Sequence, residues 1–173
     1  MKKSLVIGLA AAVVLAIVGI AWATDDDKDD LNAAGLAKAL SEASVSLDQG
    51  LKASESEGKP ISGKFEIQDG ALQLSVYTMK GNQFSEVAVD HKSGSIKKSE
   101  PITDPDDLKD AKEQGEAMAK AKLPLAAAVA SAVKANNGSR AVSAVPMLDG
   151  GQPMASVTLI NEGEVKKVTE KLD

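Results

Sequence analysis

The feature that most constrains this chain is that one order of helical and strand patterns runs along it twice. From Leu31 to Ile102, apolar residues at helical spacing are followed by period-2 alternation with turn residues, and the same order returns from Leu108 to Asp173. Alternation with turns this close together is typical of antiparallel meanders with one buried face. We therefore expect an α+β fold of two repeats, in which each repeat packs helices on a three- to four-stranded antiparallel sheet.

The first unit, residues 31–102, begins with two helical patterns. Apolar residues recur at three-residue spacing from Leu31 to Ala43, and Ser46 with Gln49 forms a capping-box signature for a second helix. The dipeptide Asp69-Gly70 marks a hairpin. Strands are predicted over residues 64–67, 72–76, 84–89 and 95–96.

The second unit, residues 108–173, follows a linker at 103–107 that is rich in Asp and contains a proline. Helices are predicted over residues 108–122 and from Leu125, and strands over 141–147, 155–160 and 165–169. Phe84–Val87 and Val165–Val168 each place two apolar residues three positions apart, which a plain strand would direct to opposite faces. We expect a β-bulge at that point in each unit.

Size and cysteine content indicate that the two units depend on each other. Each is near the lower limit for an independent core, and the chain has no Cys to supply a disulfide. We expect the units to pack on one another, or the protein to pair with a second copy. The patterns leave open whether the units share one sheet.

The N-terminus has the pattern of a secretory signal peptide. Lys2 and Lys3 precede an uncharged run, and small residues at Ala21 and Ala23 mark a peptidase site, so a signal peptide is predicted over residues 1–23. This pattern predicts a periplasmic or secreted location. The alternative is an uncleaved membrane anchor over residues 4–22, which is at the short limit of a bilayer span. Residues 24–30 form an acidic leader that we expect to be disordered, with cation binding as a minor alternative.

Charge and aromatic content argue against nucleic acid as a partner. Without the predicted signal peptide the chain keeps 18 basic and 25 acidic residues, a formal charge of −7, which repels phosphate backbones. The full chain has four aromatic residues, of which Trp22 lies in the signal. Three aromatics are too few for a base-stacking platform.

The sequence carries no recognisable catalytic, cofactor or metal site. His91 is the single histidine, it lies in a predicted turn, and we expect it to be exposed. One His and no Cys exclude the usual zinc sites. Phosphate-loop, dinucleotide and nucleophile-elbow motifs are absent from the sequence. We therefore expect a protein that is not an enzyme and binds no cofactor.

The turn after the third predicted strand, Val89-Asp90-His91-Lys92-Ser93-Gly94-Ser95-Ile96, resembles the closing turn of the PepSY family. The helix start at Val45–Gln49 is also similar to the family's opening. The resemblance covers residues 44–102 and, without the closing turn, 123–173. It implies a helix packed on an antiparallel sheet, an extracytoplasmic setting and a role in binding or restraining peptidases. It carries over no catalytic residue.

The turn itself has a structural explanation. Asp90 can accept backbone amide hydrogen bonds, and Gly94 can adopt the positive φ that the next strand requires. In addition to these two, the predicted turn motif comprises Val89, Ser93 and Ile96.

These observations favour an exported protein-binding module whose partner is a protein, with an envelope peptidase as one candidate, or a second copy of itself. A structural or stress-related envelope protein is the first alternative. A membrane-anchored sensory accessory, with residues 4–22 retained, is the second. Open strand edges could cover each other or accept an extended peptide. Lys97-Lys98 and Lys166-Lys167 are interpreted as edge residues that discourage aggregation.

Overall fold

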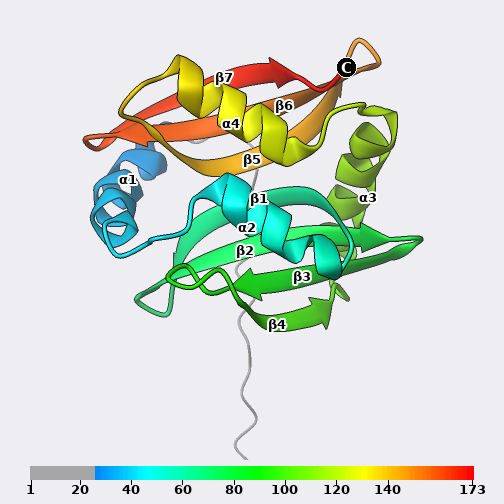
Figure 1. Ribbon diagram of the computed structural model, residues 1–173, viewed down its shortest axis with the longest axis horizontal. Helices are drawn as coiled ribbons and strands as arrows, with labels where there is room; N and C mark the ends of the chain where they lie inside the picture. Colours follow the sequence, from blue (N-terminus) through cyan, green and yellow to red (C-terminus); the bar gives the residue numbers. More distant parts are fainter. Residues whose placement is uncertain (1–25) are drawn as a thin grey trace, which may run out of the picture.

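The computed structural model describes the backbone of residues 26–173 and the side chains of residues 33–173. All strands join one seven-stranded antiparallel sheet in the order β4-β3-β2-β1-β5-β6-β7 (Figure 1). The strands that the sequence assigns to two units therefore form a single sheet. Their bounds are β1 Lys59–Gln68, β2 Ala71–Lys80, β3 Gln83–Val89, β4 Ile96–Pro101, β5 Arg140–Asp149, β6 Gln152–Asn161 and β7 Glu164–Lys171.

Four α-helices pack on this sheet, and a short 3₁₀ turn, η1 (Ser54–Ser56), follows the second. The first helix begins inside the segment predicted as an acidic leader. The third begins inside the predicted linker, because the Asp104 side chain accepts hydrogen bonds from the amides of Asp106 (2.9 Å) and Asp107 (3.3 Å). The bounds are α1 Asp26–Leu40, α2 Leu47–Ala53, α3 Pro105–Lys120 and α4 Leu125–Ala135.

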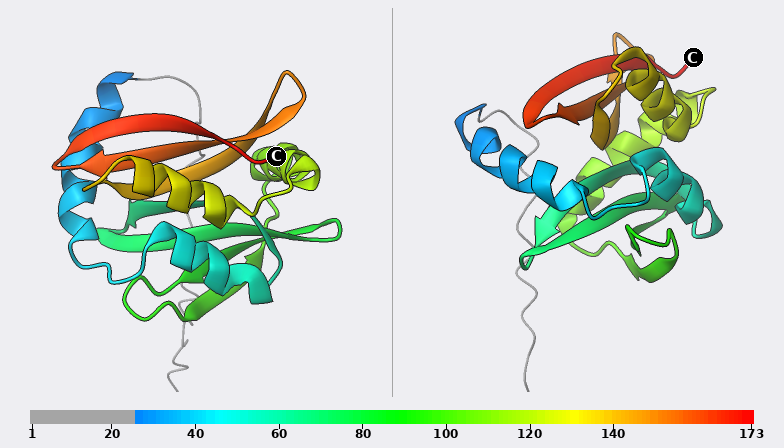
Figure 2. Two further views of the ribbon diagram at one scale, coloured as in Figure 1. Left: turned by 45° about the horizontal axis from the view of Figure 1, so that its top comes forward. Right: turned by 60° about the vertical axis from the view of Figure 1, so that its left-hand side comes forward.

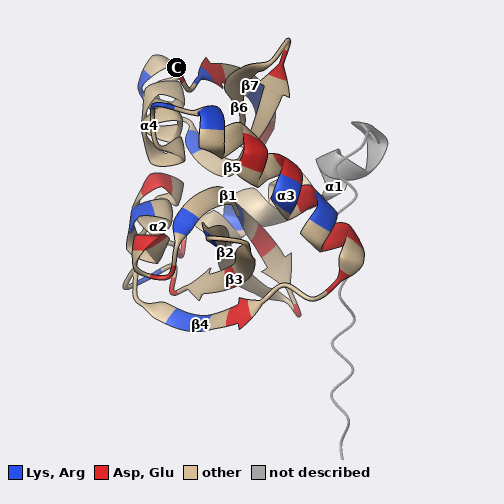
Figure 3. Ribbon diagram, turned by 90° about the vertical axis from the view of Figure 1, so that its right-hand side faces the viewer, with Lys and Arg blue, Asp and Glu red and all other residues tan. Residues whose placement is uncertain are grey.

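Helices α2 and α4 lie side by side on one face of the sheet (Figures 1 and 3). The predicted capping box starts α2, where the Ser46 amide donates to Gln49 Oε1 at 2.9 Å. Close approach to the sheet needs a glycine, because a Cβ at Gly50 would lie 2.5 Å from Leu74 Cδ2. Fully buried side chains fill this layer; they include Leu47, Leu51, Leu74, Val76, Leu125, Val129, Val157 and Leu159.

Helices α1 and α3 stand near opposite ends of the strands (Figure 2). The second helix of this pair contacts β1, β5 and β6. Its Gln114 Oε1 accepts a buried hydrogen bond of 2.6 Å from Ser62 Oγ in β1, and its Gly115 lies against Met79 and Phe84. Helix α3 therefore contacts strands that precede it in the sequence as well as β5 and β6, which follow it, and so links the N- and C-terminal parts of the chain.

Strands β1 and β5 make the central pairing, with Gly63 opposite Ala144 and Lys64 opposite Ser143. Register shifts lie in these two strands, between Pro60 and Ser62 and between Ala141 and Ser143.

The bulges predicted in Phe84–Val87 and Val165–Val168 are wrong, because the β2–β3 and β6–β7 registers run without interruption. Phe84 packs under α3 whereas Val87 is buried on the other face. Since β3 is covered on both faces, apolar residues three positions apart need no bulge.

Candidate binding cleft

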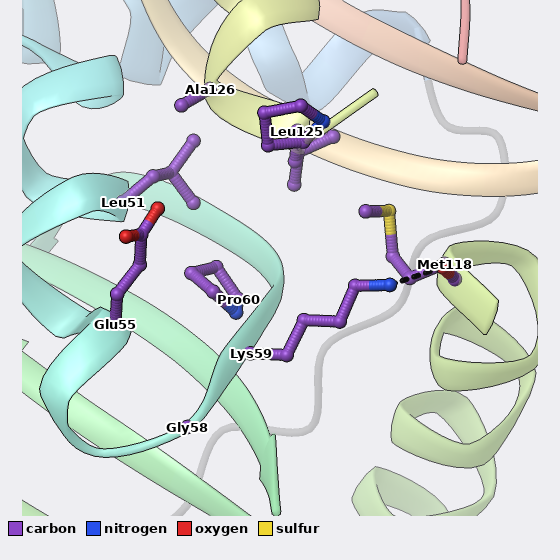
Figure 4. Close-up of a pocket in the computed structure, with 9 residues that line it drawn as sticks. Leu51, Glu55, Gly58, Lys59, Pro60, Met118, Leu125 and Ala126 are labelled. Atoms are coloured by element: carbon purple, nitrogen blue, oxygen red, sulfur yellow. Dashed lines mark hydrogen bonds between the residues drawn. The ribbon is translucent and has the colours of Figure 1, made fainter. Parts of the chain in front are cut away.

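A cleft of about 220 Å³ opens between the start of β1 and the connection from α3 to α4 (Figure 4). One wall comes from the end of α2, η1 and the first residues of β1, and the other comes from residues about 60 positions later in the chain. The lining residues are Leu51, Glu55, Gly58, Lys59, Pro60, Met118, Pro124, Leu125 and Ala126.

The floor of the cleft is apolar. Leu51, Met118 and Leu125 line it, and each is at most 1% exposed. Pro60 and Pro124 add rigid apolar surface because their rings fix the backbone. An apolar floor of this kind favours an aliphatic or aromatic group over a charged one.

Two charged residues line the mouth. Lys59 Nζ donates to the Met118 carbonyl oxygen at 2.5 Å, so this ammonium is held against the end of α3. Glu55 is exposed, and it forms no ion pair with any other residue that the structure describes. The cleft therefore offers an apolar floor with the Lys59 ammonium and the Glu55 carboxylate at its rim.

Sequence reasoning missed this cleft. Its walls come from segments that the sequence treats as a helix stop, Gly58-Lys59-Pro60, and a helix start at Pro124. Either segment alone looks like ordinary turn chemistry. The concave surface exists only because β1 pairs with β5 and brings the two connections together.

The predicted turn motif lies elsewhere, at the β3–β4 connection. Asp90 Oδ1 accepts from the amides of Lys92 (2.9 Å) and Ser93 (2.8 Å), and Gly94 has a φ of 77°. Lys97 Nζ lies 2.9 Å from Asp90 Oδ2, and this bond, with the two amides, holds the pKa of the Asp90 carboxyl well below its usual range. Val89 is buried and Ile96 opposite it is half-buried, so they close the turn.

His91 differs from its expected exposure. Its side chain is half-buried, and Nδ1 is buried with no hydrogen-bond partner among the described residues. The His91 carbonyl oxygen accepts from the amides of Ser44 and Val45, both at 3.0 Å. The turn is therefore packed against the α1–α2 connection.

Ala21 and Ala23, the predicted signal-cleavage residues, lie outside the described residues. Within residues 26–173, no helix is long and apolar enough to cross a membrane. Among the side chains that the structure describes, no group of three or more His, Cys, Asp or Glu is arranged to hold a metal ion.

Comparison with known proteins adds no relative. No family model, no curated protein and no solved structure matches this chain.

Proposed function

We propose that this chain is an exported protein-binding module without enzymatic activity, built from two PepSY-like units. Its partner is a protein, with an envelope peptidase as the candidate that the sequence resemblance suggests. The cleft between the two units receives an apolar side chain of that partner.

The sheet supports the two-unit part of this proposal. The register shifts in β1 and β5 stand immediately before Ser62 and Ser143, and the same sequence interval separates Gly63 from Ala144. Those two residues face each other at the centre of the sheet. An approximate two-fold axis through this pair would relate the two units and place β1, β2 and β3 on β5, β6 and β7, with β4 as the strand that has no counterpart.

The helices support the same relation. Among the described side chains of α1, from Ala33 onward, Ala33 and Leu40 are buried, and the buried Ala111 and Met118 of α3 have the same spacing. The carbonyl oxygens of Leu40 and Met118 each accept a hydrogen bond from a cation at the start of a strand in the other unit, Arg140 and Lys59 respectively. Two matching bonds of this kind are expected if one unit was duplicated.

One observation carries the binding proposal: an apolar cleft whose rim bears the carboxylate of Glu55, which has no ion-pair partner within residues 33–173. A floor of Leu51, Met118 and Leu125 accepts an apolar side chain. Glu55 attracts a basic group on its own side of the rim, away from the Lys59 ammonium, which points to Met118 (Figure 4). An extended segment that carries an apolar residue next to Lys or Arg fits both features. A module that holds such a segment of an envelope peptidase would restrain that enzyme.

A capture experiment tests the proposal. The chain from Thr24 to Asp173 is immobilised, incubated with an envelope extract, and the bound proteins are identified by mass spectrometry. We expect the immobilised chain to retain one protein in an amount nearly equal to its own. The Glu55→Lys variant, which reverses the charge of that side chain at the rim, should no longer retain this protein. Glu57→Lys is the matched control, because Glu57 lies two residues away and does not line the cleft. Equal retention by both variants, or retention of no other protein, would refute the cleft as the binding site.

A further inference from the structure

The two edges of the sheet differ in their fitness to accept another strand. Strand β4 is short, ends at Pro101 and has a register shift at Ala88/Val89 in its pairing with β3. Strand β7 pairs with β6 over eight consecutive residues without a shift, and it contains no proline. Irregularity, proline and lysine protect an edge, whereas a long regular edge invites pairing. Both edge strands carry lysines, so irregularity and proline are what distinguish them. Strand β7 is therefore the open edge, and it forms one margin of the sheet (Figure 1).

The backbone groups that β7 directs outward follow from the preceding turn. Asn161 pairs with Glu164 across a two-residue loop in which Glu162 and Gly163 both have positive φ, as in a type I′ hairpin. Such a loop is closed by a hydrogen-bonded pair, and hydrogen-bonded and non-hydrogen-bonded pairs then alternate. The residues whose amide and carbonyl groups point away from β6 are Val165, Lys167, Thr169 and Lys171.

We propose that β7 pairs antiparallel with β7 of a second copy of this chain, so that two sheets join into one. In this pairing Val168 lies opposite Val168 of the second copy, and Lys166 lies opposite Glu170 of the second copy. The two-fold symmetry makes the Lys166–Glu170 pair twice. The outward backbone groups of each β7 then meet those of the other.

Charge selects this register over its neighbours. In an antiparallel pair, residues directly opposite share a face, so the possible registers differ by steps of two residues. A shift by one step in one direction places Lys167 opposite Lys167 of the second copy, and a further step in that direction places Lys166 opposite Lys166. A shift by one step in the other direction places Lys167 opposite Lys171 of the second copy. Like charges directly opposite destabilise a pair. The proposed register has no direct like-charge opposition.

Hydrogen bonds already hold the side chains of Lys166 and Glu170 in place. Lys166 Nζ donates to Asn136 Oδ1 at 2.6 Å, and Glu170 Oε2 accepts from Ser131 Oγ at 2.9 Å, so the α4 side of the sheet holds both. Because these partners are neutral, neither charge is compensated by them. In the proposed pairing, Lys166 and Glu170 belong to non-hydrogen-bonded pairs, in which side chains approach most closely. On β4 the charged side chains already form an ion pair with each other, since Lys98 Nζ lies 2.7 Å from Glu100 Oε2.

Charge reversal tests the pairing in the chain from Thr24 to Asp173. We expect sedimentation equilibrium to give twice the monomer mass for the native sequence. Lys166→Glu and Glu170→Lys should each shift the protein to monomer, and the double variant should restore the dimer, because both pairs are then re-formed with opposite polarity. Lys98→Glu, on the other edge, should leave the dimer unchanged. A monomeric native protein, or a double variant that stays monomeric while its circular dichroism is native, would overturn the proposal.

A single cysteine gives a second test that does not depend on charge. The chain contains no Cys, so Val168→Cys introduces one thiol on the proposed two-fold axis. Opposed residues of a non-hydrogen-bonded pair bring their Cβ atoms to a distance that a disulfide can bridge. Mild oxidation should yield a covalent dimer of Val168→Cys and little of Ser99→Cys, the control at the centre of β4. Equal cross-linking of both variants, or none of Val168→Cys, would contradict the register.

Discussion

Arg140, the first residue of β5, donates a hydrogen bond of 2.5 Å to the carbonyl oxygen of Leu40, the last residue of α1. A second bond of 3.2 Å reaches the Ala43 carbonyl oxygen. The last carbonyl groups of a helix have no partner within it and carry partial negative charge. A guanidinium from 100 residues further along the chain satisfies them, so this contact ties α1 to the C-terminal strands.

Removal of this tie should destabilise the whole protein. We expect Arg140→Met, which keeps an apolar stem but no donor, to lower the free energy of unfolding by about 1.5–3 kcal/mol, the range for a hydrogen bond to a charged group. Urea denaturation followed by circular dichroism measures this value. Lys134→Met is the matched control, because Lys134 is exposed in the last turn of α4. Equal losses in the two variants would show that Arg140 is only a surface charge.

Two helical glycines should respond to alanine in opposite directions. A Cβ at Gly50 would lie 2.5 Å from Leu74 Cδ2, and Leu74 is fully buried, so Gly50→Ala should destabilise by about 1–3 kcal/mol through overpacking. A Cβ at Gly35 would meet Ile67 at an ordinary 3.7 Å. Gly35→Ala should therefore stabilise by up to about 1 kcal/mol, because alanine is the better helix former. Thermal unfolding measures both, and a stabilising Gly50→Ala would show that α2 shifts freely.

Asp90 should make the free energy of unfolding depend on pH in the acid range. Its pKa is lowered from an ordinary value of 3.8, first by the bond to Lys97 and then by the amides of Ser93 and Lys92. A lowered folded-state pKa contributes stability above the unfolded value, and this contribution is lost as the pH falls below it. Asp90→Asn should therefore be less stable than the native protein at pH 7, with the difference shrinking below a pH of about 4. Urea midpoints of both proteins, measured at pH 7 and below pH 4, test this prediction. A difference in stability that does not change with pH would contradict it.

Tyr77 offers a direct spectroscopic measurement, because it is the single tyrosine of the chain. Burial, followed by the nearby carboxylates of Glu86, Glu66 and Asp107, raises the pKa of its hydroxyl well above 10.0. The folded state therefore keeps the phenol neutral, and its stabilising effect is present below pH 10 and lost above it. We expect the phenolate absorbance to appear together with unfolding. A titration near pH 10 with native circular dichroism would show that the ring is accessible.

The local part of the fold was predictable from sequence because its causes are local. The Ser46–Gln49 capping box and the hairpin at Asp69-Gly70 involve residues within three positions of each other. The antiparallel order within each group of strands follows from connections too short for any other pairing. The sequence pattern predicts the start of α3 three residues late, because Asp104 resembles linker composition although it is the N-cap.

The sequence by itself determined the α+β class, the order of elements and their turns, since periodicity and turn residues act over a few neighbours. Only the tertiary structure decided that Gly63 meets Ala144, because no local pattern specifies which strand edges pair. That one pairing unites the strands in a single sheet and places the register shifts of β1 and β5 at its centre. It also brings Lys59 to Met118 to form the cleft, and it leaves β7 as the open edge.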